Sequence, residues 1–287
     1  MTEESISLVQ RQRHLKVLLF LFITCFFFLY PGVTFAGTGH TIAGPEFTND
    51  QDWIQEETGG NNVSDVIGVS SDHTLDLFSN PSPWQIRAAG TVGDVSGSGA
   101  DIHAISGVFV GGGVNETFTN SGTISAEATI GDVSSSSSAQ INSIYGVFVG
   151  GGVNETFNNS GTISASAKMG DVSSSSSAQI NSIYGVFVGV GDVTTFTNSG
   201  TISASAKMGD VSSSSSAQIN SIYGVFVGGG DVTDTFTNSG TISAVAIMGN
   251  VDGSSAQINS IYGVFVSGDV TYTFNNSGTI SASATMG

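Results

Sequence analysis

The sequence predicts an all-β protein, a right-handed parallel β-helix built from 39-residue units of two coils each. Three observations lead to this fold class. The motif GVFV recurs at a constant interval of 39 residues, ending at Val110, Val149, Val188, Val227 and Val266. After each copy, the motif NSGTIS begins a stretch in which β-branched and small residues alternate, the pattern of a half-buried strand. Glycine is abundant, at 39 residues, and only 10% of the residues are charged, which suits short strands joined by tight turns.

The first 36 residues have the layout of a secretory signal peptide and are set apart from the fold. A basic flank that ends at Lys16 precedes the apolar run Val17–Val33, and small residues lead up to a cleavage position after Ala36. The apolar run is also long enough to be a retained membrane anchor. Pro31 and Gly32 near its end favour cleavage.

Without this leader the chain would have no cysteine and very few bases. Cys25, the only cysteine, lies in the apolar run, so we expect no disulfide, no cysteine-based zinc site and no cysteine nucleophile. The remaining three bases are Arg87, Lys168 and Lys207, against 21 of the 23 acidic residues, so the net charge is near −18 (3 − 21). Such a chain repels nucleic acid and anionic membranes, because both are bound through Lys and Arg.

Residues 37–88 lack the repeat and contain both tryptophans, Trp53 and Trp84. The open end of a β-helix exposes unpaired strand edges, which invite edge-to-edge association unless they are covered. We therefore expect residues 37–88 to form an N-terminal cap or irregular first coils, and residues 89–287 to form the β-helix repeat domain.

The two-coil interpretation rests on a second set of Asn-Ser pairs, which precedes each IYGVFV motif. The two sets alternate with gaps of 21 or 22 and 17 or 18 residues, each close to the length of one β-helix coil. Stacked asparagines would hydrogen-bond along the helix axis and hold the corners. The predicted structural ladder contains Asn120, Asn142, Asn159, Asn181, Asn198, Asn220, Asn238, Asn259 and Asn276. In the first unit His103 stands in the corresponding place.

Within the strand Thr201–Ala206, alternation predicts which side chains enter the core. Ile202, Ala204 and Ala206 would face inward, with the serines between them outward. Phe196 would fill the space beside Ile202. Each coil would bury this apolar face only against its neighbours, which explains why the stretch recurs.

The phenylalanine of each GVFV motif has two possible placements. If Val147 and Val149 point inward, Phe148 points outward and the set forms an external aromatic stripe. If a bend at Gly146 reverses the alternation, the stack is internal. Internal stacking is the favoured prediction, because an exposed aromatic stripe of this length would promote association with other molecules. The set consists of Phe109, Phe148, Phe187, Phe226 and Phe265.

A column of turn aspartates follows the strands of successive units: Asp94, Asp132, Asp171 and Asp210. With two coils per unit, neighbouring members would lie ~9.6 Å apart, twice the strand spacing. That separation is too large for a shared calcium ion, whose oxygen ligands lie within about 2.6 Å of it. We therefore interpret these residues as solvated loop carboxylates.

No catalytic, cofactor-binding or metal-binding residue is predicted, because a residue that recurs in every unit is more typical of structure than of catalysis. His40, His73 and His103 are too scattered to indicate a metal site. The unrepeated segment holds an acidic group around Trp53, and this is where an alternative enzymatic site would lie. The group consists of Glu46, Asp50, Asp52, Glu56 and Glu57.

The tripeptide Thr-Phe-Thr occurs in several units and is similar to the Thr-x-Thr ladders of ice-binding solenoids. It is replaced by Thr-Phe-Asn in two units. With two coils per unit, it would also occupy only every second coil. The sequence therefore does not predict ice binding.

The motif pair IYGVFVG and F(T/N)NSGTISA resembles the repeats of bacterial autotransporter passenger domains, which alternate a Tyr-Gly-Val/Ile strand with an Asn-Ser-Gly-Thr-Ile turn and strand. The resemblance covers about Ala88–Gly287. It implies export to the cell surface or the extracellular space of a Gram-negative bacterium. Members of this family carry a C-terminal outer-membrane barrel, and no such segment is evident in the sequence. We therefore expect a chain truncated in mid-coil at Gly287, or a barrel on a separate chain.

These observations favour a non-enzymatic, surface-exposed or secreted β-helical passenger, adhesin-like, that binds host or cell-surface ligands. No cofactor, nucleic acid or stable small-molecule ligand is expected. One alternative is a polysaccharide-acting β-helix enzyme with its site in residues 37–88. Another is a purely structural spacer.

Overall fold

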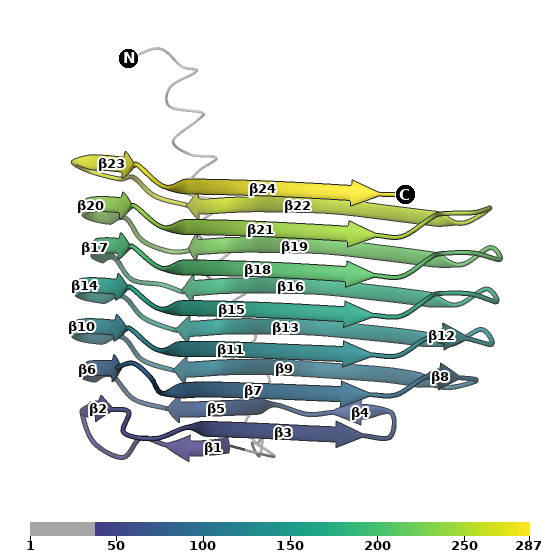
Figure 1. Cartoon of the computed structure of the whole chain (residues 1–287), viewed down its shortest axis with the longest axis horizontal. Helices are drawn as coiled ribbons and strands as arrows, with labels where there is room; N and C mark the ends of the chain where they lie inside the picture. Colours follow the sequence, from purple (N-terminus) through teal and green to yellow (C-terminus); the bar gives the residue numbers. More distant parts are fainter. Residues whose placement is uncertain (1–37) are drawn as a thin grey trace, which may run out of the picture. The chain divides into compact units, whose positions relative to one another are not determined.

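In the computed structural model, which describes residues 38–287, every regular element is a β-strand (Figure 1). Three parallel sheets, here called A, B and C, run along the stack, and the chain visits A, B and C in that order in every layer. Seven strands follow one another in each sheet, so the chain makes about six turns. The predicted all-β parallel β-helix is therefore confirmed.

The strands of the three sheets have the following bounds. Sheet A contains β1 (Thr38–Thr41), β5 (Val66–Ser71), β9 (Gly99–Val110), β13 (Ser138–Val149), β16 (Ser177–Val188), β19 (Ser216–Val227) and β22 (Ser255–Val266), with β4 (Asn62–Val63) paired to β9. Sheet B contains β2 (Glu46–Thr48), β6 (Leu75–Asn80), β10 (Val114–Asn120), β14 (Val153–Asn159), β17 (Val193–Asn198), β20 (Val232–Asn238) and β23 (Thr273–Asn276). Sheet C contains β3 (Trp53–Gly59), β7 (Gln85–Val92), β11 (Thr123–Ile130), β15 (Thr162–Met169), β18 (Thr201–Met208), β21 (Thr241–Met248) and β24 (Thr279–Met286). The short strands β8 (Val95–Ser96) and β12 (Val133–Ser134) pair with each other.

Each 39-residue unit forms one coil, so the prediction of two coils per unit is wrong. Identical residues one unit apart face each other across neighbouring strands, as Ile141 faces Ile180 in sheet A. The two sets of Asn-Ser pairs lie on different sheets of the same coil, with Asn142 on β13 and Asn159 at the end of β14. The alternating gaps in the sequence therefore measure the path from one sheet to another within a coil.

The unrepeated segment supplies the first two layers of the same stack. Strands β1, β2 and β3 form the first layer, and β5, β6 and β7 form the second. Strand β7 pairs with β11 of the first repeat in unbroken register, with Ile86 opposite Ile124. Residue 88, the expected end of this segment, lies inside β7. The expected signal peptide, residues 1–36, lies outside the described residues.

Two apolar columns fill the interior. One lies between sheets A and C and contains residues such as Ile141 and Met169. The other lies where all three sheets meet and contains Val147, Phe157 and Ile163. Because every coil contributes the same residues, each column continues through the neighbouring coils and buries the apolar face that a single coil would leave open.

The predicted inward residues of β18 are buried. Ile202, Ala204 and Ala206 are at most 1% exposed, and Phe196 on the neighbouring strand β17 is fully buried. These predictions are confirmed, because the outward residues between them remain partly exposed.

Gly185 lies on β16 of sheet A, where sheet C approaches sheet A closely. A Cβ atom on Gly185 would lie 2.6 Å from the carbonyl oxygen of Gly224 and 2.7 Å from Cγ2 of Ile202. Both distances are well below van der Waals contact, so only glycine allows sheets A and C to approach this closely.

Candidate functional site

The predicted asparagine ladder is in fact two ladders on different sides of the coil. The first is buried and runs through sheet B, where Asn120 donates from Nδ2 to Oδ1 of Asn159 at 2.8 Å and to the carbonyl oxygen of Gly122 at 3.2 Å. Its members are Asn49, Asn80, Asn120, Asn159, Asn198, Asn238 and Asn276. Along this ladder the side-chain amide of one asparagine donates a hydrogen bond to the side-chain oxygen of the next, so these polar groups are paired inside the core. The ladder therefore has a structural role.

The second ladder lies on sheet A, and its hydrogen bonds run in the opposite direction. Asn181 donates from Nδ2 to Oδ1 of Asn142 at 2.9 Å, and Asn142 donates to the carboxylate of Asp101 at 2.6 Å. Its members are Asp101, Asn142, Asn181, Asn220 and Asn259. Most of these side chains are partly exposed, so this ladder faces outward from sheet A.

The phenylalanines of the GVFV motifs also lie on the outer side of sheet A, so the favoured prediction of an internal stack is wrong. Val147 and Val149 belong to the interior column, whereas Phe148 belongs to a separate cluster with Tyr145. The strand pairing skips Gly146, and the alternation changes there in the direction opposite to the expected one, so that Val147 and not Phe148 faces inward. The stripe nevertheless exposes little apolar surface.

Stacking explains that low exposure. Phe148 and Phe187 lie 5.1 Å apart with nearly parallel rings, so each ring covers a face of the next. Tyr145 packs edge-on against Phe148 at 5.1 Å. Phe148 and Phe187 are consequently only 7% and 8% exposed although they point away from the interior.

A column of tyrosines accompanies this stripe, and the sequence reasoning missed it. Tyr145, Tyr184, Tyr223 and Tyr262 stack 5.2–5.3 Å apart. Burial raises the pKa of Tyr184, so its phenol stays protonated at physiological pH. The recurrence of Tyr at the same 39-residue interval as GVFV was the available signal.

A row of glutamines completes this surface. Gln140 pairs in register with Gln179, as Gln179 does with Gln218 and Gln218 with Gln257. Within residues 38–287 these four side chains make no hydrogen bond, and most are half-buried. We call the outward rows of Gln, Asn, Tyr and Phe on β13, β16, β19 and β22 the sheet A outer face.

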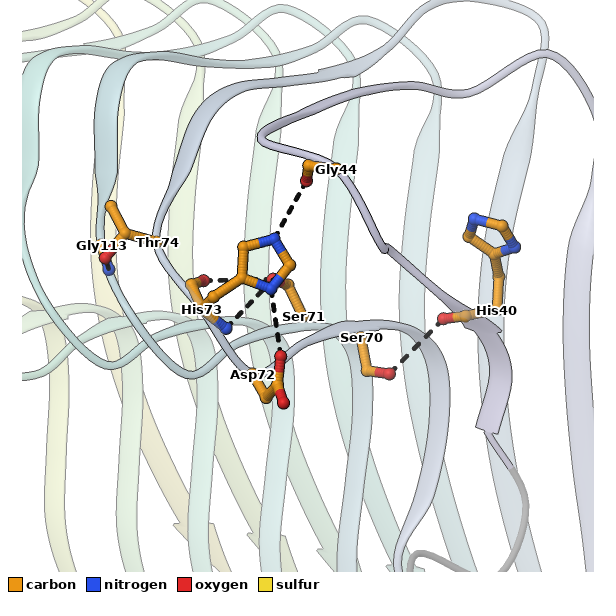
Figure 2. A network of polar contacts seen from close by, with 8 residues as sticks. All are labelled: His40, Gly44, Ser70, Ser71, Asp72, His73, Thr74 and Gly113. Atoms are coloured by element: carbon orange, nitrogen blue, oxygen red, sulfur yellow. Dashed lines mark hydrogen bonds and ion pairs between the residues drawn. The ribbon is translucent and has the colours of Figure 1, made fainter.

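A polar network joins the first two layers near the N-terminal end (Figure 2). His73 contacts both Ser71 Oγ at 3.3 Å and Asp72 Oδ1 at 3.0 Å through Nδ1, and its Nε2 lies 3.0 Å from the carbonyl oxygen of Gly44. A Ser-His-Asp triad requires the serine and the carboxylate on different ring nitrogens. Here they share one nitrogen, so the network connects two loops and does not form a triad.

The hydrogen bond to the Gly44 carbonyl, followed by the contact with Asp72, raises the pKa of His73. The hydrogen bond from His73 lowers the pKa of Asp72. The two groups therefore form an exposed ion pair below the raised pKa of the histidine.

His103 lies on sheet A beside two carboxylates. Its Nδ1 is 2.6 Å from Oδ1 of Asp65, and this hydrogen bond raises the pKa of His103. Burial raises the pKa of Asp101, which accepts the hydrogen bond from Asn142. His40, in contrast, packs against Trp53 with tilted rings whose centroids are 4.3 Å apart. The three histidines thus have separate surroundings.

The acidic group around Trp53 is divided among structural contacts. Arg87 forms ion pairs with Glu56 and, at 2.8 Å, with Glu127. Asp52 accepts a hydrogen bond from the backbone N–H of Gln85 at 2.9 Å. These contacts link neighbouring strands of sheet C and join the start of β7 to the residue before β3, and they involve two of the five acids, Asp52 and Glu56.

The turn aspartates are closer together than the sequence predicts, because each unit is one coil. The carboxylate of Asp132 accepts a hydrogen bond from the backbone N–H of Asp171 at 2.9 Å, and Asp171 accepts one from Asp210 at 2.9 Å. Asp94 accepts the corresponding bond from Asp132 at 3.0 Å. Each carboxylate therefore holds the turn of the following coil.

Within residues 38–287, no group of three or more His, Cys, Asp or Glu side chains is arranged to hold a metal ion. The same residues include no helix of the length and apolar character needed to cross a bilayer. Comparison of the chain with protein-family models, with curated proteins and with solved structures gave no match.

Proposed function

We propose that this chain is a non-enzymatic, surface-exposed or secreted β-helical passenger with an adhesin-like role, and that the sheet A outer face binds its ligand. The observation that supports this proposal is the repetition of Gln, Asn and Tyr rows in register on one face. Such rows offer the same contacts in successive coils, about 4.8 Å apart. A long ligand can then bind through many weak, equivalent contacts.

The chemistry of these rows favours hydroxyl-rich ligands such as cell-surface glycans. The glutamine amides have both donors and acceptors that no described residue uses. Burial raises the pKa of Tyr145, Tyr184 and Tyr223, so these phenols stay protonated and keep both a donor and acceptor capacity. The net charge of −17 disfavours polyanionic ligands, so neutral glycans are the better class.

Export and surface display are part of the same proposal. The apolar leader at residues 17–33 and the resemblance of the repeats to autotransporter passengers support it. The location is tested by fractionating the producing cells and by protease treatment of intact cells. Retention of the chain inside the cell would contradict it.

Ligand binding is tested by applying the full chain to arrays of neutral glycans and of host matrix proteins. The double variant Gln179→Ala/Gln218→Ala loses two unpaired amides, and at about 0.5–1.5 kcal/mol each we expect an affinity loss between about 5-fold and about 150-fold. The matched control is Ser166→Ala/Ser205→Ala on the outer side of sheet C, which should bind like the native chain. Binding that both variants leave unchanged would move the site away from sheet A, and no binding would favour the spacer interpretation.

A further inference from the structure

We propose that the threonine rows on the outer side of sheet B bind the surface of ice. Two rows of side chains project outward on either side of the inward phenylalanine in Thr-Phe-Thr. The first row is Thr117, Thr156, Thr195, Thr235 and Thr273. The second row is Thr119, Asn158, Thr197, Thr237 and Asn275. This inference is independent of the ligand proposed for sheet A.

The rows are continuous because each repeat forms a single coil. Thr156 pairs with Thr195, and Thr195 pairs with Thr235, with no intervening layer. Each of the five repeated coils therefore carries either Thr-Phe-Thr or Thr-Phe-Asn, and no coil between them lacks the motif. The first row has no interruption over those five coils, and the second has asparagine in two of them.

The rows are also straight, as the phenylalanines beneath them show. Successive rings from Phe118 to Phe274 are 4.7–4.8 Å apart, with interplanar angles of only 1–4°. Neighbouring coils are thus related by a translation with almost no rotation. Ordinary sheets twist by about 20–25° per strand, and flat sheets are found where stacked side-chain ladders hold them. The Phe stack and the buried Asn ladder are two such ladders.

The resulting array of hydroxyl groups is regular in two directions. Along the stack the repeat is the 4.7–4.8 Å spacing of the coils. Along the strand the two rows are two residues apart, or about 6.6 Å. A face of ice is likewise a two-dimensional periodic lattice of oxygen atoms, so a regular array of hydroxyl donors and acceptors can hydrogen-bond to it at repeated positions. Threonine suits this role because its branched side chain has restricted χ1 freedom and holds the hydroxyl in one orientation.

The hydroxyl groups are available to water. Among the eight threonines of the two rows, only Thr235 makes a side-chain hydrogen bond within the described residues, to Asp234 at 3.2 Å. The two rows themselves contain no charged residue, and the exposed acids Glu116, Glu155 and Asp234 directly precede three threonines of the first row.

The test measures thermal hysteresis and the inhibition of ice recrystallisation with the full chain. We expect the native chain to show both activities. Thr195→Tyr places a bulky ring in the middle of the first row and should reduce the activity at least severalfold. Asn158→Thr removes an interruption from the second row and should increase it.

Ser203→Tyr is the matched control, because it lies in the same coil on the outer side of sheet C. Its activity should equal that of the native chain, and circular dichroism should show the same β-structure in all variants. Absence of activity in the native chain would overturn the proposal. So would full activity in Thr195→Tyr, an equal loss in Ser203→Tyr, or no gain in Asn158→Thr.

Discussion

Replacement of Phe196 by alanine should destabilise the solenoid strongly. The Phe196 ring is fully buried and lies 4.8 Å from Phe157 and 4.7 Å from Phe236 in nearly parallel stacks. Truncation of a buried phenylalanine costs about 3–5 kcal/mol through lost transfer free energy and the cavity that remains. The variant also lacks the two ring-stacking contacts of Phe196, each of which contributes about 0.5–1.5 kcal/mol beyond area burial. The upper part of the range, about 4–5 kcal/mol, is therefore expected.

The assay is urea unfolding of the full chain followed by far-ultraviolet circular dichroism, with the slope of the transition compared among variants. Phe274→Ala is the matched control, because Phe274 belongs to the same column but is 50% exposed and has one ring neighbour, Phe236. It should cost less than about half as much as Phe196→Ala, since less apolar area is lost. Equal costs for the two variants, or a cost below about 1 kcal/mol for Phe196→Ala, would refute a buried, stacked column.

Four further outcomes follow from the same contacts. Gly185→Ala should lower the unfolding free energy by several kcal/mol, because its Cβ would meet backbone oxygen at 2.6 Å; unchanged urea unfolding would contradict this. Asn198→Ala should cost about 1–3 kcal/mol by leaving buried amides unpaired, whereas Asn220→Ala on the outer ladder should cost less in the same assay. Deletion of residues 159–197 should leave a folded protein by circular dichroism, because the flanking coils present the same interface; an unfolded product would argue against independent coils. The pKa of His73 is raised in the folded chain, so protonated His73 stabilises the fold. This stabilisation is fully present below pH 6.5 and is lost as pH rises through the raised value. Amide exchange in β2 should therefore accelerate with pH more in the native chain than in His73→Gln after correction for intrinsic exchange.

The local pattern of the sequence determined the strands and their inward faces. Alternation in Thr201–Ala206 is fixed by the period of two of a β-strand, so Ile202 and Ala204 could be placed inside without knowledge of the fold. The repeat interval likewise determined that equivalent residues stack on one another. These features need only backbone geometry and the burial of apolar side chains.

Only the tertiary structure decided how many sheets one coil contains. Gaps of 17 and 22 residues fit either a whole coil or the path between two sheets of a larger coil, since tight turns at Asn-Ser-Gly occur in both. The larger coil is closed by contacts between residues far apart in the sequence, such as Ile163 against the glycine at position 146. Sequence spacing does not contain that information.

The candidate surfaces were also decided by tertiary contacts. Whether Phe148 faced in or out depended on the backbone at Gly146, where the pairing is irregular and sheet C approaches too closely for a side chain. The outward position is tolerated because stacking and the tyrosine column cover the rings. The continuity of the threonine rows depended in turn on one coil per unit. Local alternation thus fixed which residues share a face, and packing between distant residues fixed which faces exist.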